Sequence, residues 1–85
     1  MAPEARIALV TGAGGSGMGR SIALTLARDG ADVALNYNSK GEQIPATQQA
    51  IAAMGRRAMP AQADITAPAA ITSMVASVTA NLGAI

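Results

Sequence analysis

The stretch that decides the fold is residues 7–20, which read IALVTGAGGSGMGR. A short apolar run leads into a cluster of five glycines, and the cluster opens directly into a helical pattern that ends near Asp29. Glycine lets the backbone approach a pyrophosphate closely, while the N–H groups and the positive dipole end of the following helix hold the anion. The stretch therefore predicts a strand, a glycine-rich turn and a helix that together bind phosphate.

The composition excludes several kinds of protein. The chain has 85 residues, so it holds one small domain at most. It has no cysteine and no histidine, which removes disulfides, thiolate metal sites and the commonest general base. The formal net charge is only +1, no apolar run approaches the length of a spanning helix, and the start does not resemble a signal peptide. We expect a cytoplasmic protein with no bound metal, no nucleic-acid partner and no membrane partner.

Strand and helix patterns alternate along the whole chain. Short apolar runs predict strands, apolar residues at helical spacing predict helices, and a glycine closes each helix. The predicted strands cover residues 6–11, 32–37 and 57–63, and the predicted helices cover residues 19–29, residues 44–54 and the segment between Thr66 and Gly83. The order β-α-β-α-β-α predicts an α/β fold, namely the incomplete N-terminal part of a doubly wound parallel-sheet Rossmann fold.

Two prolines help to place the start of the second helix and the position of the third strand in the sheet. Ser39 and Glu42 have the spacing of a capping box, but Pro45 would then lie inside the helix at a cost of about 3 kcal/mol. A helix that begins near residue 44 places Pro45 in the first turn and avoids this cost. Pro60 predicts that the third strand lies at an edge, as it does in the strand order 3-2-1-4.

Apolar stripes predict which helix faces are buried. Ile22 and Leu26 share the apolar face of the first helix, and two alanines flank it. The last helix has Thr66 as its expected N-cap and Pro68 in its first turn. Its apolar stripe, which we assign to the core, consists of Ile71, Met74, Val75, Val78 and Leu82.

A second phosphate-binding pattern lies in the same glycine cluster. Residues 14–21 come close to the P-loop of nucleoside triphosphatases, but Arg20 stands where that loop requires a lysine. The segment before Asp64 also lacks the apolar strand that should lead to a magnesium-binding acid. We keep a P-loop-type triphosphatase fragment as an alternative.

Three charged residues receive simpler interpretations. Asp32 lies 20 residues after Gly12, near the spacing of a ribose-binding acid. It begins the second strand, however, whereas ligands bind at the carboxyl ends of strands. We therefore expect Asp32 to be solvated at the far end of that strand, and Arg56 and Arg57 to be solvated as well.

Several motifs together resemble the short-chain dehydrogenase/reductase family, and within it the bacterial 3-oxoacyl-[acyl-carrier-protein] reductase-like branch. The motifs are Ala8–Gly12, Gly17–Ala23, Asp29–Val33, Asn36–Ser39, Met54–Ala58 and Gln62–Ile65. They resemble the first strand, the end of the glycine motif with its helix, the turn into the second strand, the loop after that strand and the third-strand region. The resemblance covers essentially the whole chain but only about the first third of a family member.

The resemblance implies a nicotinamide dinucleotide cofactor held by the loops after the three strands. The residues implied to bind it are Gly12, Gly15, Ser16, Gly17, Met18, Gly19, Asn38, Ser39, Asp64 and Ile65. Asp64 falls where the family contacts the adenine ring, and it also suits the N-terminal end of the last helix as an acid. Four residues rather than the family's three separate Gly12 from Gly17, and the register Gly12-x-Gly14-x-x-Gly17 also fits.

The end of the second strand favours NADP(H), with NAD(H) as the alternative. An acid that binds the ribose hydroxyl would stand at position 37 or 38, where this sequence has the neutral residues Tyr37 and Asn38. Without that acid a ribose 2′-phosphate is not repelled. Ser39 can donate a hydrogen bond to the phosphate, and Lys40 can supply positive charge.

The family's catalytic serine and its Tyr-x-x-x-Lys pair have no counterpart here, so we assign no catalytic residue. We interpret residues 1–85 as one truncated NAD(P)-binding Rossmann domain, inactive alone, from an NAD(P)(H)-dependent oxidoreductase. By resemblance, the full-length enzyme is a homo-oligomer that transfers hydride between nicotinamide and a small carbonyl or alcohol substrate. The alternative from another class is a free-standing nucleotide-binding module without catalysis.

Overall fold

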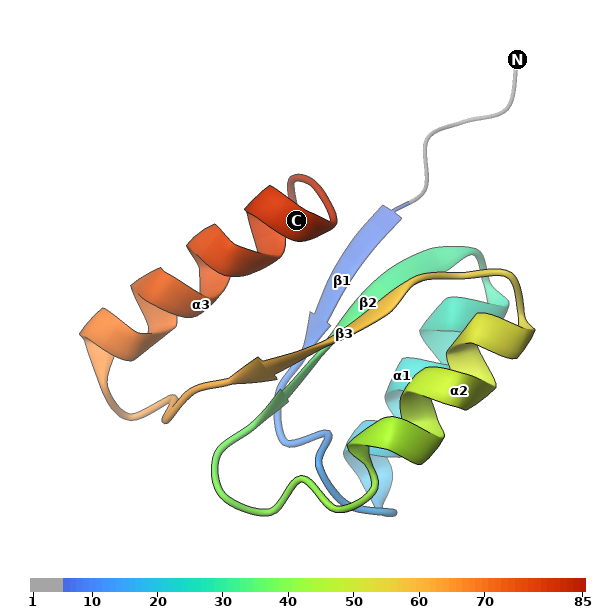
Figure 1. The fold of residues 1–85 in the computed structure, drawn as a ribbon, viewed down its shortest axis with the longest axis horizontal. Helices are drawn as coiled ribbons and strands as arrows, with labels where there is room; N and C mark the ends of the chain where they lie inside the picture. Colours follow the sequence, from blue (N-terminus) through green and yellow to red (C-terminus); the bar gives the residue numbers. More distant parts are fainter. Residues whose placement is uncertain (1–5) are drawn as a thin grey trace.

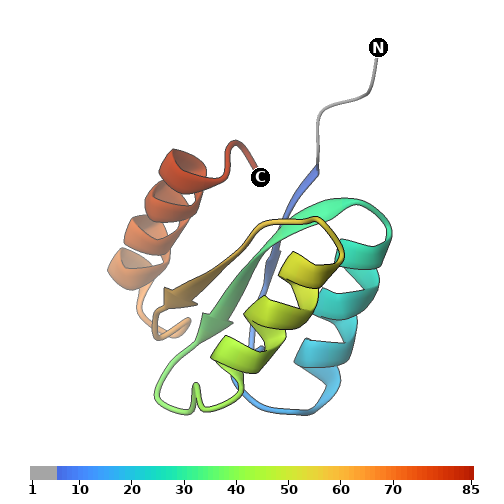
Figure 2. The same cartoon turned by 45° about the vertical axis from the view of Figure 1, so that its right-hand side comes forward.

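A computed structural model describes residues 6–85. Three strands form one sheet, with two helices on one face and the third helix on the other (Figures 1 and 2). The elements are β1 (Arg6–Val10), α1 (Met18–Arg28), β2 (Ala31–Tyr37), α2 (Ile44–Ala53), β3 (Ala58–Gln62) and α3 (Pro68–Asn81). The predicted α/β order is therefore confirmed, and each element's bounds lie within about two residues of the prediction.

The sheet is parallel and has the order β1-β2-β3. Val10 is in register with Leu35 of the middle strand, and Leu35 is in register with Pro60 of β3. Pro60 thus lies in an edge strand, as its missing N–H requires. This is the 3-2-1 part of the predicted order, and the outer side of β1 has no strand partner within residues 6–85.

The middle strand is buried on both faces, as expected for a covered parallel sheet. Val33 and Leu35 face α1 and α2, where they pack with Ile51. On the opposite face, Ala34 packs with Met74 and Val78 of α3. Aliphatic residues and methionines thus form two thin cores, one on each face of the sheet.

The buried face of α1 differs from the prediction. Ala23 and Ala27 are buried, whereas the side chain of Ile22 is 45% exposed. Small alanines let the helix axis approach the sheet closely, so they take the inner face and turn Ile22 outward. The α1 face was therefore predicted about one residue out of phase.

The apolar stripe of α3 is only partly buried. Met74 and Val78 are buried against the sheet, whereas Ile71 and Val75 are 36% and 37% exposed. Met74 and Val78 are one helical turn apart, so they lie on the same face of α3, and this face packs against Ala34 and Ala61 of the sheet. The core assignment is correct for this pair and for Leu82, which is partly buried against the same cluster, and wrong for Ile71 and Val75.

The helix ends follow the sequence with one exception. Gly30, Gly55 and Gly83 all have positive φ angles, as glycines that terminate helices commonly do. Pro68 begins α3, but its N-cap is Ala67 and not Thr66. The Thr66 hydroxyl instead donates a hydrogen bond to the Asp64 carboxylate, at 2.6 Å.

No helix within residues 6–85 is long and apolar enough to cross a lipid bilayer.

Candidate nucleotide-binding site

The loops that follow the three strands leave the same edge of the sheet (Figure 1). This happens because all three strands run in parallel, so their carboxyl ends lie together. Every residue expected to bind the cofactor belongs to one of these loops or to the first turn of α1. The topology thus gathers the predicted site residues at one edge.

Hydrogen bonds tie the first part of the glycine loop to its neighbours. The Ala13 N–H donates to the Asn36 carbonyl at 2.7 Å, and the Gly12 N–H donates to Asn36 Oδ1 at 3.3 Å. The Gly14 carbonyl accepts a bond from the Gln43 N–H at 3.1 Å. Because the Gly12 and Ala13 amides are already engaged, a phosphate at this loop must meet amides that come later.

Those later amides belong to the start of α1. The N–H of Ser21 donates to the Gly17 carbonyl at 3.2 Å, so the amides of Gly17, Met18 and Gly19 precede the first bond of the helix. The helix has no acidic residue in its first turn and no side chain that caps it. Its positive end is therefore available to an anion.

Three glycines in this loop have geometric reasons to be glycine. A Cβ on Gly14 would collide with the carbonyl oxygen of Lys40. Gly12 has a φ angle of 65°, in the left-handed region that residues with a Cβ rarely adopt. A Cβ on Gly19 would collide with the carbonyl oxygen of Gly12. The loop thus folds back on the first turn of α1, and a side chain at any of these positions would displace it.

A cavity of about 360 Å³ lies between the glycine loop and the end of β2. Its wall consists of Gly12, Gly14, Gly15, Tyr37, Asn38, Ser39 and Lys40. The structure therefore brings together four predicted site residues, Gly12, Gly15, Asn38 and Ser39. Ser16, Gly17, Met18 and Gly19 continue from the cavity wall into α1 and do not line it.

Asp64 and Ile65 follow β3 and do not line this cavity. The Asp64 carboxylate accepts hydrogen bonds from the Thr66 N–H and hydroxyl, which shape the turn before α3. The hydroxyl bond, followed by the backbone bond, lowers the pKa of Asp64 below its ordinary value. Both residues are exposed, so the turn leaves them accessible at the carboxyl edge.

Asn36 is a residue that the sequence reasoning did not single out for any role. Its side chain is buried, and its hydrogen bonds reach Gly12, Ala61 and Ala63. The sequence did contain a signal for Asn36, because a polar amide within an otherwise apolar buried strand must find hydrogen-bond partners.

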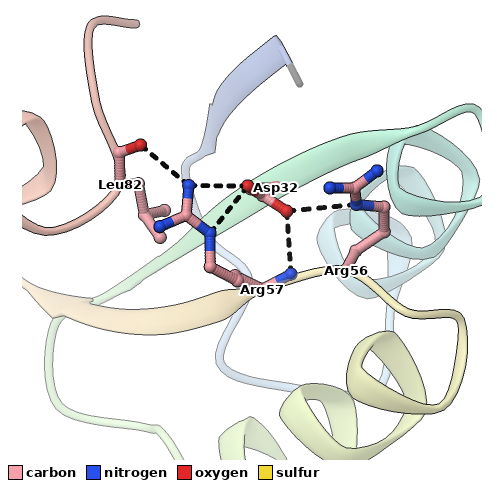
Figure 3. A network of polar contacts seen from close by, with 4 residues as sticks. All are labelled: Asp32, Arg56, Arg57 and Leu82. Carbon is pink, nitrogen blue, oxygen red and sulfur yellow. Dashed lines mark hydrogen bonds and ion pairs between the residues drawn. The ribbon is translucent and has the colours of Figure 1, made fainter. Parts of the chain in front are cut away.

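Asp32 lies at the far end of β2, as predicted, but it is not solvated (Figure 3). Its side chain is 1% exposed and forms ion pairs with Arg56 at 3.1 Å and Arg57 at 2.9 Å. Arg57 also donates its backbone N–H to this carboxylate and its guanidinium to the Leu82 carbonyl. The expectation of a solvated charge was wrong for Asp32, because Val33 is in register with Ala58, which brings both arginines beside it. The arginine side chains stay partly exposed, as expected, but both are paired with Asp32.

Burial opposes ionisation of Asp32, but the hydrogen bonds from Arg57 and Arg56 outweigh it. Together with the charge of Arg57, they lower the pKa of Asp32 below its ordinary value. This carboxylate belongs to the amino end of the sheet, opposite the cavity. It therefore holds the fold together and does not serve as the ribose-binding acid.

Arg20 does not take the part of a P-loop lysine. Its Nε donates to the hydroxyl of Thr47 at 3.2 Å, and Thr47 is fully buried on α2. The guanidinium is thus held against a neighbouring helix. Within residues 6–85, no group of three or more acidic, histidine or cysteine side chains is placed to hold a metal ion.

Comparisons with known proteins agree with this geometry. The profile of the family described as short chain dehydrogenase matches residues 6–85. Hydroxynaphthalene reductase arp2 of Aspergillus fumigatus is 45% identical over 78 residues, which cover 92% of this chain and 28% of that protein. The chain belongs to the short chain dehydrogenase family, and this membership removes the P-loop alternative.

Solved structures of the family have the same fold. A short chain dehydrogenase from Burkholderia cenocepacia J2315, in complex with NADP, is 44% identical with a TM-score of 0.84, over 92% of this chain and 31% of that one. A short-chain type dehydrogenase/reductase from Mycobacterium marinum is 36% identical with a TM-score of 0.80, over 94% and 32%. The chain thus spans about a third or less of the length of these relatives.

Proposed function

We propose that residues 6–85 form the adenosine and pyrophosphate half of the cofactor site in an NADP(H)-dependent oxidoreductase. The observation that carries the proposal is the open N-terminus of α1, which adjoins a cavity lined by the glycine loop and the residues after β2. Family membership and a similar structure in complex with NADP support it. The bound nicotinamide would supply or accept a hydride, and a small carbonyl or alcohol is the proposed substrate.

Each loop has a proposed part in holding the cofactor. Gly12 shapes the glycine loop, and the backbone of Gly15, Ser16, Gly17, Met18 and Gly19 binds the pyrophosphate through its amides. Asn38 and Ser39 bind the adenosine ribose and its 2′-phosphate, with Lys40 as a nearby positive charge. Asp64 and Ile65 border the adenine. In each case the chain binds and orients the cofactor and does not react with it.

The preference for NADP(H) over NAD(H) is part of the proposal and can be tested directly. In the full chain that carries these residues, we expect tighter binding of NADPH than of NADH, measured by fluorescence titration. Asn38→Asp should reverse the preference by about tenfold or more, since a carboxylate repels the 2′-phosphate and binds the ribose hydroxyl. Tyr37→Asp should act in the same direction, but its ring packs on Gly41, so it also perturbs the loop.

A matched control separates local charge from overall charge. Gln49→Glu adds the same negative charge on the exposed face of α2 and should leave the NADPH/NADH ratio unchanged. Equal or tighter NADH binding by the unmodified protein would contradict the preference. No measurable binding of either dinucleotide would contradict the proposed function itself.

The alternative of a free-standing nucleotide-binding module predicts a reading frame that stops after the codon for Ile85. Reading the frame beyond the codon for Ile85 is the cheapest test. An open frame that encodes a Tyr-x-x-x-Lys pair supports the oxidoreductase, because that pair is the proton donor the resemblance implies. A stop codon at this point supports the module. Homo-oligomer formation and a cytoplasmic location of the full-length enzyme stay predictions.

A further inference from the structure

One buried side chain joins three segments of the carboxyl edge. The side chain of Asn36, in the middle strand, is 2% exposed. Its Oδ1 accepts a hydrogen bond from the Gly12 N–H at 3.3 Å. Its Nδ2 donates to the carbonyls of Ala61 at 3.0 Å and Ala63 at 3.2 Å, and it lies 3.3 Å from the sulfur of Met74.

These partners belong to both sides of the proposed cofactor site. Gly12 opens the glycine loop, whereas Ala63 directly precedes Asp64 and Ile65. The Asn36 carbonyl also accepts the N–H of Ala13 at 2.7 Å, so this one residue holds the loop through its side chain and its backbone. Met74 adds a contact from α3.

We propose that Asn36 is a positioning residue that sets the spacing between the glycine loop and residues 63–65. The inference rests on the proposed function, because it assigns these two segments to the pyrophosphate and the adenine of one dinucleotide. A ligand that bridges both segments depends on their spacing, whereas a ligand bound at one of them does not. Asn36 therefore controls the affinity for the whole dinucleotide without touching it.

The hydrogen-bond pattern requires a primary amide of this length. A carboxamide offers two donors to the two carbonyls and one acceptor to the Gly12 N–H. Asn36→Asp keeps the shape and the acceptor but turns a carboxylate oxygen toward the carbonyls of Ala61 and Ala63. Asn36→Leu keeps the branched shape in a bulkier side chain and removes every hydrogen bond that the side chain forms. The two variants thus separate the loss of the β3 side from the loss of both sides.

The test compares a ligand that bridges both segments with a shorter one. The dissociation constants of NADPH and of adenosine 2′-monophosphate, which lacks the 5′-phosphate and therefore does not reach the glycine loop, are measured in the full chain that carries these residues. For Asn36→Leu and Asn36→Asp we expect NADPH binding to weaken by about tenfold or more, and adenosine 2′-monophosphate binding by about twofold or less. In turnover, the KM for NADPH should rise while kcat at saturation stays near that of the unmodified protein.

The control is a core variant with a similar loss of stability. Val78→Ala opens a fully buried site on α3, and its side chain packs in the cluster on the α3 face of the sheet. It should lower the melting temperature and leave both dissociation constants unchanged. If Asn36→Leu does not fold, the conclusion rests on the measurements with Asn36→Asp.

The outcomes distinguish a failure of the proposed function from a failure of the positioning role. If the unmodified protein does not bind NADPH, the proposed function fails and the positioning role falls with it. If it binds NADPH and the Asn36 variants bind it as tightly as Val78→Ala does, the positioning role alone is wrong. Equal weakening of NADPH and adenosine 2′-monophosphate would also overturn it, because that result shows general damage to the site.

Discussion

At the scale of single residues, several positions of the glycine loop exclude a side chain, and Gly12 and Gly19 are two of them. Gly12→Val places a β-branched residue at a φ of 65°, and Gly19→Val drives a side chain into the Gly12 carbonyl. Each variant should weaken NADPH binding by at least about a hundredfold in an equilibrium titration, since the amides of α1 would move away from the phosphates. Arg20→Ala should have a milder effect, because that side chain bonds to Thr47. Complete loss of binding in Arg20→Ala alone would contradict this ranking.

A second prediction at this scale concerns Asp32, which holds both arginines and, through Arg57, the end of α3 (Figure 3). Asp32→Asn should lower the free energy of unfolding at neutral pH by about 1–3 kcal/mol, a modest range because both guanidinium groups are partly exposed. The pKa of Asp32 is lower in the folded state than in the unfolded chain, so the carboxylate stabilises the protein above the ordinary value of 3.8. That contribution is lost as the pH falls below this value. Urea unfolding of both proteins at pH 7 and near pH 3 measures the difference.

The control for this experiment is Asp64→Asn, which alters an exposed carboxylate whose bonds stay within its own turn. We expect it to change the free energy of unfolding by no more than about 0.5 kcal/mol. A difference between Asp32 and Asp32→Asn that persists undiminished at low pH would show that the ion pairs are not its source.

At the scale of elements, the sequence alone predicted the kinds, order and approximate bounds of all six. Glycines with positive φ and prolines in first turns mark helix ends through local sterics, which a sequence displays directly. The predictions that were wrong concern side chains whose surroundings are set by other elements. The ion pairs of Asp32 arise from strand register, and the inner face of α1 is chosen by how closely it approaches the sheet. Likewise the loops of the candidate site could be predicted, whereas the role of Asn36 required the structure.

The contact between α1 and α2 carries a prediction at the same scale. Thr47→Val preserves the shape of a fully buried side chain but removes the acceptor for Arg20 Nε. We expect a loss of about 1 kcal/mol in the free energy of unfolding by urea titration, with binding of NADPH changed little. Thr25→Val is the matched control, because its hydroxyl bonds only to the exposed backbone one turn earlier in α1. An equal loss in both variants would mean that the bond between the helices contributes nothing of its own.

At the scale of the whole molecule, the position of β1 leads to the last prediction. β1 pairs with β2 alone within residues 6–85, and the C-terminal end of the chain lies beside it, where Gly83 approaches Ile7 (Figure 1). An apolar strand with an unpaired side promotes association between chains. We therefore expect the 85-residue chain, made alone, to be poorly folded or aggregated and to exchange the amides of residues 7–10 rapidly. We also expect no dehydrogenase activity, since Tyr37 is the only tyrosine and Gly41 stands four residues later. Hydrogen exchange followed by mass spectrometry tests the first expectation. Strong protection of residues 7–10 in a soluble monomer would contradict it, because β1 would then need no further partner, and the free-standing module would be the better interpretation.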